Sequence, residues 1–370
     1  MSKTLAELRV LIDSVDQDLL IALNRRAALA NEVGELKRHD GSPVFRPERE
    51  AQVIHGLQKA NQGPIKDASL ALIWREIMSA CRALEAPQRV AYLGPKGTYS
   101  EEAALRFFGS SIQHVPCNNF DEVFHAATSG AAEFGVIPVE NSTEGVVPRS
   151  LDLLLNSPLH IVGEISLLVR HHLLRTESSL GGIEVVLAHP QALAQCQQWL
   201  STHLPNAERR AVSSNAEGAR LAALHPEWAA IASERAGAEF GLHIAAQAIQ
   251  DEAFNRTRFV MVCLPAVMPA PQASGKDCTS LVVSVPNKPG AVHDMLVPLK
   301  LHGVSMTRFE SRPARSGQWE YFFYIDLVFP DYTRYLQALD AIRPLTEHLQ
   351  ILGEYQNGQR PPENKTIEEN

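Results

Sequence analysis

The chain has 370 residues, of which 45% are hydrophobic and 21% charged, and its formal net charge is −8 at pH 7. This length accommodates two or three packed domains, and the composition excludes a largely disordered chain. Because the overall charge is negative, general attraction to nucleic acid or to an anionic membrane is also excluded. We therefore expect small-molecule partners, with anionic ligands held by local clusters of Arg and Lys.

The cysteines indicate reduced thiols. There are five of them and no CxxC pair, which favours neither a disulfide framework nor a zinc site. We expect no metal ion and no cofactor. The sequence starts directly with an amphipathic pattern, and no apolar run approaches the roughly 18 residues of a membrane span. The expected location is the cytoplasm.

Residues 1–88 are predicted to form an all-α domain. From Leu5 to Leu36, apolar residues recur every three or four positions, with Arg26 as the one exception in the series. This heptad-like pattern predicts a helix of about 50 Å, too long to bury its stripe in one small domain. A second helix should begin near Pro47, and a third should run from Asp67 to Glu85.

The rest of the chain follows two other patterns. Residues 89–265 alternate short apolar runs with helical stretches, which predicts an α/β domain with a mainly parallel sheet. A Pro- and Ala-rich linker at 266–278 follows. Residues 279–356 read as βαββαβ, the ferredoxin-like α+β arrangement, and residues 357–370 as a loose tail.

Four motifs in the central region point to one family. They are GPKGTYS at 94–100, PVENSTEG at 138–145, HPQ at 189–191 followed by Gln195 and Cys196, and NRTRF at 255–259. The first places two glycines and a Ser/Thr-x-x-Glu capping pattern before a helix, where backbone N–H groups can hold an anion. Together the motifs resemble those of prephenate dehydratase over nearly all of residues 89–265.

The resemblance implies a two-lobed fold like that of periplasmic binding proteins, with prephenate in the cleft between the lobes. It marks Thr257 as the essential residue. Further catalytic candidates are Glu140, Asn141 and Gln195, and candidate substrate contacts are Thr98, Ser100, Ser142, Thr143 and Arg258. Each could also have a local structural role, such as capping a turn, but all together favour a site.

The reaction limits the roles these residues can take. Loss of carbon dioxide together with the ring hydroxyl requires a proton donor at the leaving oxygen and residues that bind two carboxylates. Arg258 suits a bidentate carboxylate contact. Thr257 is a poor acid but a good oriented donor, whereas a buried Glu140 could be a general acid. The sequence leaves these two proton sources as alternatives.

Basic residues on the first helix predict a second site. Arg26 and Lys37 lie about 20° apart around the helix axis and about 16 Å along it, so both can line one pocket. Arg9 is about 25 Å from Arg26 on another side, so it can serve the same ligand only from a second subunit. A plain dimerising hairpin with snorkelling basic side chains is the alternative.

This segment resembles the all-helical chorismate mutase, an intertwined dimer. The resemblance implies site residues Arg9 (from the partner), Arg26, Lys37, Arg46, Arg49, Glu50, Cys81 and Glu85. Relatives often have Asp, Ser and Gln where this chain has Arg46, Cys81 and Glu85. The rearrangement is pericyclic, so the arginines need only hold the carboxylates while Lys37 donates to the ether oxygen. Glu85 can donate there only as a neutral acid.

The C-terminal segment resembles the ACT domains of prephenate dehydratases. The resemblance implies a phenylalanine site formed by PGAVH and ESRP, with candidate residues Gly290, Ala291, Val292, Glu310, Ser311, Arg312 and Pro313. Gly290 lets the backbone approach a ligand at a helix start, where N–H groups favour a carboxylate. A purely structural dimerisation unit is the alternative.

The sequence thus predicts a bifunctional enzyme of phenylalanine biosynthesis. It would rearrange chorismate to prephenate, convert prephenate to phenylpyruvate, and be inhibited by phenylalanine. We expect a homodimer or a larger homo-oligomer. Two alternatives remain: a dehydratase whose helical domain only dimerises, and a non-catalytic regulator or solute-binding protein that kept the fold.

Overall fold

A computed structural model describes residues 3–40, 43–267, 276–314 and 320–356. Most of the predicted linker and the predicted tail at 357–370 lie outside these residues. The described chain forms two compact units. The first contains the N-terminal residues up to Arg89 together with Leu105–Gln113, and the second contains the remainder. None of the described helices is long and apolar enough to cross a bilayer.

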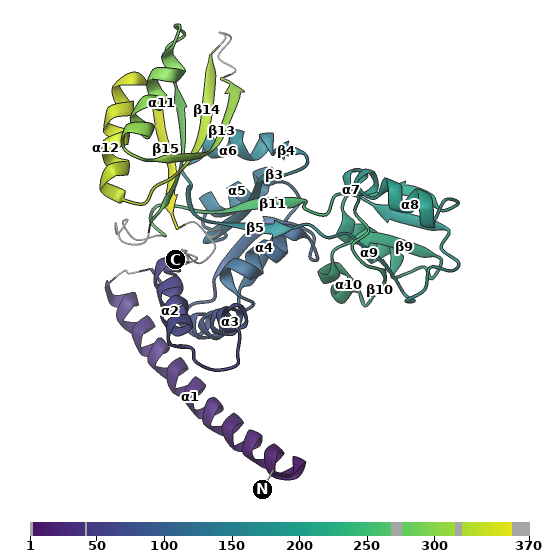
Figure 1. The fold of residues 1–370 in the computed structure, drawn as a ribbon. Helices are drawn as coiled ribbons and strands as arrows, with labels where there is room; N and C mark the ends of the chain where they lie inside the picture. The colour runs from purple at the N-terminus through teal and green to yellow at the C-terminus, as the bar shows by residue number, and fades with distance from the viewer. Residues whose placement is uncertain (1–2, 41–42, 268–275, 315–319, 357–370) are drawn as a thin grey trace, which may run out of the picture. The chain divides into compact units, whose positions relative to one another are not determined.

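The first unit is built on three helices, α1 (Leu5–Asp40), α2 (Pro47–Ala60) and α3 (Asp67–Glu85) (Figure 1). Pro47 occupies the first turn of α2, where its missing N–H is not needed. Phe45, Met78, Cys81 and Phe108 are buried, whereas the apolar stripe of α1 is exposed in the single chain, with Val15 at 56% and Leu19 at 54%. The stripe leaves a long apolar surface on one helix of the single chain.

The second unit begins with a lobe around a mixed sheet in the order β2-β1-β3-β11-β5, with the short β4 paired to β3. Its elements are β1 (Arg89–Leu93), α4 (Tyr99–Phe108), β2 (Gln113–Cys117), α5 (Phe120–Thr128), β3 (Phe134–Asn141), β4 (Gly145–Val146), α6 (Pro148–Leu155), β5 (His160–Leu168) and β11 (Arg256–Cys263).

A second lobe is inserted between β5 and β11. Its sheet has the order β10-β6-β9-β7-β8. Its elements are β6 (His172–Arg175), β7 (Val185–Ala188), α7 (Pro190–Gln195), α8 (Gln197–His203), β8 (Glu208–Ala211), α9 (Asn215–Ala222), β9 (Trp228–Ala232), α10 (Glu234–Phe240) and β10 (His243–Ala246).

The prediction of a mainly parallel sheet is wrong for this region. β11 runs antiparallel to both β3 and β5, and β6 runs antiparallel to β9 and β10. The cause is the inserted lobe. The chain leaves the first lobe after β5 and returns through β11, and this return places β11 in the middle of a sheet whose earlier strands run the other way.

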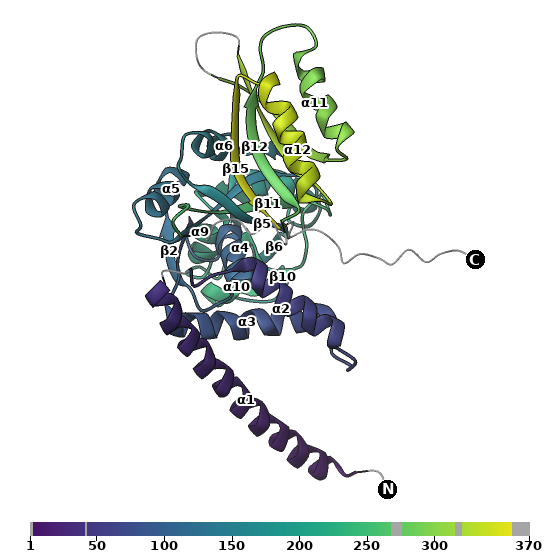
Figure 2. The ribbon, with the colours of Figure 1, turned by 90° about the vertical axis from the view of Figure 1, so that its left-hand side faces the viewer.

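The C-terminal segment has the element order β12 (Cys278–Ser284), α11 (Ala291–Leu301), β13 (Ser305–Pro313), β14 (Tyr321–Val328), α12 (Tyr332–Ile342), a 3₁₀ turn (Arg343–Leu345) and β15 (His348–Tyr355). Its four strands pair antiparallel in the order β13-β14-β12-β15. This is a βαββαβ arrangement. Figure 2 shows α11 and α12 against the sheet.

The two faces of this C-terminal sheet have different neighbours, because side chains alternate along each strand. Leu281 and Val283 of β12 pack with buried residues of α11 and α12. Val282, between them, belongs to the core of the first lobe, with Leu151 and Ile161. The C-terminal sheet is therefore packed directly on the β-sheet that carries NRTRF.

Candidate active sites

A cavity of about 340 Å³ lies between the two lobes. Its size falls in the range of small-molecule sites. The described residues that line it are mostly neutral and polar, and none of them is Asp, Glu, Lys or Arg. They include Thr98, Tyr99, Ser100, Asn118, Asn141, His171, His189, Gln191, Gln195, Ser213, Ser214, Asn215, Ser233, Asn255 and Thr257.

Asn141 and Thr257 meet at this cavity because β3 and β11 pair there in register. The N–H groups of Thr143 and Glu144 donate to Asn141 Oδ1, at 3.0 and 3.1 Å. These two donors fix the orientation of the amide, since only its oxygen can accept. Asn141 Nδ2 then donates to Thr257 Oγ1 at 2.9 Å. With its oxygen already accepting, the Thr257 hydroxyl keeps its own hydrogen for another acceptor.

A line of amides continues from Asn141 toward the second lobe. Asn141 Nδ2 also donates to Asn255 Oδ1 at 2.8 Å, and Asn255 Nδ2 donates to Gln195 Oε1 at 3.2 Å. Each amide therefore accepts at one end and donates at the other. Three side chains from distant parts of the sequence are held in one orientation.

His171 lies at the end of this line. Its Nε2 is 3.0 Å from Gln195 Oε1, and an amide oxygen can only accept, so Nε2 carries the hydrogen. Its Nδ1 is buried and has no hydrogen-bond partner among the described residues. Burial lowers the pKa of His171, and this effect outweighs the opposing hydrogen bond to Gln195. The ring is therefore neutral near pH 7.

Two helices begin at the cavity, one from each lobe. α4 starts after Gly97, whose φ of 84° is in the left-handed region that glycine tolerates. α9 starts after Ser214, whose side chain caps the helix by accepting from the N–H of Glu217. The first-turn N–H groups of a helix lack intrahelical partners and favour an anion. The cavity can thus hold negative charge without a basic side chain.

The helical unit brings together several of the predicted mutase residues. Lys37 Nζ lies 3.6 Å from Glu85 Oε2 and 3.2 Å from the carbonyl oxygen of Val44. Arg26 Nη1 contacts Cys81 Sγ at 2.9 Å. Gly34 permits this proximity of α1 and α3, because a Cβ there would be 2.6 Å from Glu85 Cγ. The half-buried Arg26, Lys37 and Glu85 form a polar patch on α1 and α3.

Other predicted mutase residues are placed differently. Glu50 is paired with the buried Arg82, which also donates to the carbonyl of Phe108 and lies over the ring of Phe45. Arg46 is half-buried, with an Nε that has no hydrogen-bond partner. Arg9 and Arg49 are exposed.

Two family models match the chain. Prephenate dehydratase matches residues 90–266, and chorismate mutase type II matches residues 8–86. A bifunctional chorismate mutase/prephenate dehydratase from Neisseria gonorrhoeae is 45% identical over 363 residues, which is 96% of this chain and 99% of that protein. The chain belongs to the bifunctional chorismate mutase/prephenate dehydratase family. It is an enzyme with both of these activities.

Solved structures agree with the fold of the second unit. The structure of a prephenate dehydratase from Arthrobacter aurescens in complex with L-Phe has a TM-score of 0.66 and 32% identity, covering 74% of this chain and 91% of that one. A protein described as a novel type of quorum-quenching acylase has a TM-score of 0.65 and 30% identity, covering 74% of this chain and all of that one. Fold likeness alone therefore does not decide the chemistry.

Within this bifunctional mutase/dehydratase, the expected role of Arg258 as a carboxylate clamp is corrected. Thr257 and Arg258 are consecutive on a strand and point to opposite faces. Thr257 lines the cavity, whereas the Arg258 guanidinium lies behind the sheet, bonded to Glu164 and Asp326. The expectation that basic residues hold the ligand is likewise wrong for this cavity.

The expected role of Glu140 as a general acid is corrected for the same reason. It pairs across the strands with Arg258, behind Asn141, and its carboxylate lies 3.7 Å from Arg258 Nη1 and 3.6 Å from Arg308 Nε. It does not line the dehydratase cavity. A general acid must reach the proton acceptor, so this placement gives Glu140 no direct role there.

Ser142 and Thr143 support the dehydratase cavity without lining it. Ser142 Oγ accepts from the N–H of Arg256 at 2.8 Å, and the N–H of Thr143 holds Asn141. Thr98 and Ser100 do line the cavity.

The predicted phenylalanine-site residues lie on α11 and β13, where Arg312 pairs with Asp152 at 3.3 Å. These residues do not line the dehydratase cavity.

Sequence reasoning assigned His171 at best a place beside the substrate, and it missed Asn255 and the Ser213–Asn215 turn. A signal existed for the last two. Asn255 opens the NRTRF motif, and Ser214 with Glu217 forms a capping pattern before α9. Nothing local distinguishes His171 from a structural core histidine.

Proposed function

We propose that the cavity between the lobes binds prephenate and that Thr257 donates a hydrogen bond to its leaving ring hydroxyl. The observation that supports this assignment is the fixed amide of Asn141. Because Asn141 Nδ2 donates to Thr257 Oγ1, the Thr257 hydrogen is free to point at the ligand. A donor fixed in advance stabilises charge that develops on an oxygen in the transition state.

The reaction proceeds without a nucleophile from the protein. The electron pair of the bond to the departing carboxylate enters the ring, the double bonds shift, and the ring hydroxyl leaves with the electron pair of its own C–O bond. A proton from the solvent converts this hydroxide to water, because Thr257 donates only a hydrogen bond. The products are phenylpyruvate, carbon dioxide and water. Thr257 strengthens its hydrogen bond as the leaving oxygen gains negative charge, which lowers the barrier.

The two carboxylates of prephenate are held by the starts of α4 and α9. Residues at both helix starts line the cavity, Thr98 and Ser100 from one lobe and Ser213 and Ser214 from the other. A carboxylate loses hydration free energy when it enters the cavity. N–H dipoles at a helix start offset part of this loss, whereas apolar groups do not. Gln195, held by His171 and Asn255, orients the ligand from the second lobe.

The test is Thr257→Val, which keeps the shape and removes the hydroxyl. We expect the dehydratase kcat to fall about 10²- to 10³-fold, as for loss of a donor to a developing oxyanion. Thr257→Ser, which keeps a hydroxyl, should retain most of the rate. Phenylpyruvate formation measures the effect, and chorismate consumption by the same chain should stay unchanged. A Thr257→Val enzyme with normal turnover would exclude this role.

For the mutase site, we propose that Arg26, Lys37, Arg46, Arg49, Glu50, Cys81 and Glu85 act with Arg9 of the partner subunit. The exposed stripe of α1 supports a dimer in which this helix crosses between subunits. The arginines hold the chorismate carboxylates, and Lys37 donates to the ether oxygen. Residues 1–88 are the proposed mutase domain and 89–265 the dehydratase domain. We also propose a cytoplasmic location.

The βαββαβ segment is proposed to be an ACT domain at residues 279–356 that binds phenylalanine through the start of α11 and the end of β13. The L-Phe complex of the Arthrobacter dehydratase supports this assignment. Phenylalanine would then inhibit by favouring a less active arrangement of the cavity. Dehydratase rates with and without phenylalanine test the proposal, and unchanged rates would refute it.

A further inference from the structure

The reverse face of the β3–β11 pair carries a cluster of charged residues that the chemistry of the cavity does not use. Asn141 and Thr257 face the cavity, and the residues before and after them, Glu140 and Arg258, form the next cross-strand pair on the opposite face. A register shift follows directly after Arg258. Such irregularities occur next to functional sites and direct side chains.

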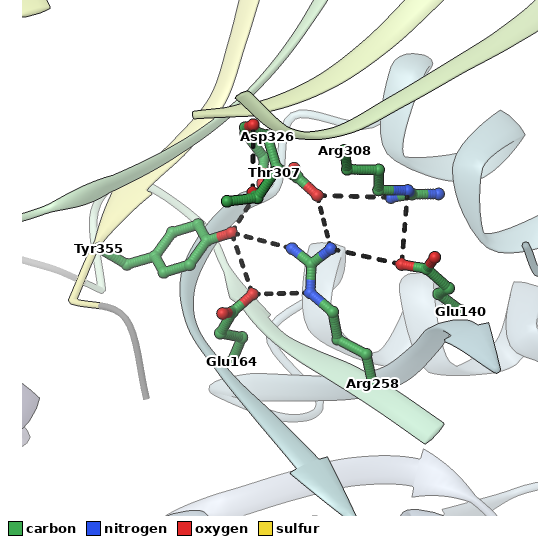
Figure 3. Close-up of polar contacts among 8 residues, drawn as sticks. Glu140, Glu164, Arg258, Thr307, Arg308, Asp326 and Tyr355 are labelled. Atoms are coloured by element: carbon green, nitrogen blue, oxygen red, sulfur yellow. Dashed lines mark hydrogen bonds and ion pairs between the residues drawn. The ribbon is translucent and has the colours of Figure 1, made fainter. Parts of the chain in front are cut away.

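Arg258 holds acceptors from two domains (Figure 3). Its Nε donates to Glu164 Oε2 of β5 at 2.7 Å. Its Nη1 donates to Asp326 Oδ2 of β14 at 2.5 Å, and its Nη2 donates to the hydroxyl of Tyr355 of β15 at 3.3 Å. One planar side chain of the dehydratase lobe therefore joins its own sheet to two strands of the C-terminal sheet.

The remaining members complete the cluster. Ser280 Oγ of β12 donates to Asp326 Oδ1 at 2.5 Å and lies 2.7 Å from the Tyr355 hydroxyl. Arg308 of β13 approaches both Asp326, at 3.7 Å, and Glu140, at 3.6 Å. Three C-terminal strands, β13, β14 and β15, thus contact Glu140 or Arg258 directly behind Asn141 and Thr257, and β12 joins the cluster through Ser280.

The cluster is buried at its centre. The side chains of Glu164 and Asp326 are each 6% exposed, and that of Arg258 is 14% exposed. Burial alone would lower the pKa of Arg258, but Asp326, Tyr355 and Glu164 raise it. Removal of one partner from such a group leaves buried charge without compensation, so its geometry is held tightly.

We propose that Arg258 is a positioning residue for the dehydratase reaction. It fastens β11 to the C-terminal domain through Asp326, so that the position of that domain sets the geometry of Thr257 and Asn141. Thr257 cannot move along or away from β3 without moving the guanidinium on the other face of the same strand. An effector that shifts the C-terminal sheet thereby has a direct mechanical route to the cavity.

The first experiment is Arg258→Lys in the full-length chain, with prephenate and chorismate assayed separately. Lys keeps the positive charge but cannot reach all three acceptors. We expect the dehydratase kcat to fall about 10-fold or more, since displacement of a catalytic group by about 1 Å can cost up to about 10²-fold. KM should change by less than about twofold, and mutase turnover should not change.

A lower kcat with a nearly unchanged KM distinguishes a positioning role from a role in substrate binding. Substitution of a residue that only binds a substrate carboxylate would raise KM and leave kcat unchanged. An Arg258→Lys enzyme with normal kcat, or one changed in KM alone, would overturn the inference. An unsubstituted chain without prephenate dehydratase activity would overturn both this inference and the proposed cavity function, so the two failures are distinguishable.

The second experiment is Asp326→Asn, which alters the C-terminal side of the contact and no residue of the cavity. We expect a lower dehydratase kcat, and we expect the double variant with Arg258→Lys to be no slower than the slower single variant. Residues that act through one contact show such non-additive effects. If the two losses in log kcat add, the coupling does not pass through this contact.

Lys276→Met is the matched control. It removes another buried ion pair of the C-terminal domain, with Glu354 at 3.3 Å and side chains 6% and 11% exposed, away from β3 and β11. We expect a lower unfolding temperature for the whole chain and an unchanged dehydratase kcat. If Lys276→Met slows the dehydratase as much as Arg258→Lys does, general loosening of the domain explains both and the inference fails.

Discussion

At the scale of single residues, His171, which bonds to Gln195 in the dehydratase cavity, makes the free energy of unfolding depend on pH. Burial lowers its pKa and that of His172 in the folded chain, whereas an unfolded histidine titrates near about 6.5. Below that pH the unfolded chain binds protons that the folded chain does not. Stability from these residues is therefore fully present above about pH 6.5 and is lost as the pH falls through the window below it.

We expect the second unit to unfold at a lower temperature at pH 5.5 than at pH 7.5, and His171→Asn to reduce this difference. Asn retains an N–H group for Gln195 but does not titrate in this range. The loss of unfolding free energy between pH 7.5 and pH 5.5 should be smaller in the variant than in the parent. Calorimetry at the two pH values measures it, and an unchanged difference in the variant would contradict the assignment.

Glu85 is the proposed second donor to the ether oxygen of chorismate. As a carboxylate beside Lys37 it can only accept hydrogen bonds, and it can donate to the ether oxygen only as a neutral acid. We expect Glu85→Gln, which always donates, to retain mutase turnover, and Glu85→Leu, which has no donor, to lose most of it. Rates of chorismate consumption by the two variants test it. Equal turnover in both variants would exclude the donor role.

At the scale of elements, β15 lies close against β5 at Gly353. Gly353 has no room for a side chain, because a Cβ there would lie 2.1 Å from the carbonyl oxygen of Ile161. The neighbour is backbone and cannot rotate away. This contact holds the C-terminal sheet against the dehydratase lobe, next to the Arg258 cluster.

We therefore expect Gly353→Ala to destabilise the second unit by about 1–3 kcal/mol, the range for overpacked interiors. Gly181→Ala is the control, because a Cβ at Gly181 meets nothing within 4 Å. Urea unfolding of the two variants measures the difference. Equal stability of Gly353→Ala and the parent would show that the two sheets can separate at this contact without cost.

The strand alternation of β11 explains why one part of the site was predictable and another was not. The NRTRF motif identified Thr257 and Arg258 together, and period-two alternation alone shows that both cannot face one cavity. Which of them faces it depends on the partners of each face. For Arg258 those partners are Asp326 and Tyr355, far along the chain in another domain.

At the scale of the whole molecule, the stripe of α1 predicts assembly. Leu8, Ile12, Val15 and Leu19 are 44–59% exposed in the single chain, and apolar surface of this extent is normally covered. In the proposed dimer, Arg9 of the partner subunit completes each mutase site. Mutase activity should therefore depend on dimerisation more strongly than dehydratase activity does.

We expect the double variant Val15→Glu, Leu19→Glu to be monomeric by sedimentation and to lose mutase activity, with dehydratase activity largely retained. The double variant Gln17→Glu, Asn24→Glu adds the same charge at heptad positions opposite the stripe and should remain dimeric. A monomer with full mutase activity would refute the shared site.

The sequence by itself determined which kind of element forms in several regions of this chain. The helix at Asp67–Glu85 and the order of the βαββαβ elements follow from local periodicity and turn residues, which act over a few positions. Contiguous motifs also identified Asn141, Gln195 and Thr257, which meet at the cavity. These features are readable because their signals are local.

Only the tertiary structure decided how the two lobes and the C-terminal sheet of the second unit contact each other. It placed β11 antiparallel in the middle of a mixed sheet, brought His171 and Ser214 to the cavity, and turned Glu140 and Arg258 toward the C-terminal domain. The physical reason is that a side chain's face and its ionic partners depend on strands that are distant in sequence. No local pattern records which of those strands will lie behind it.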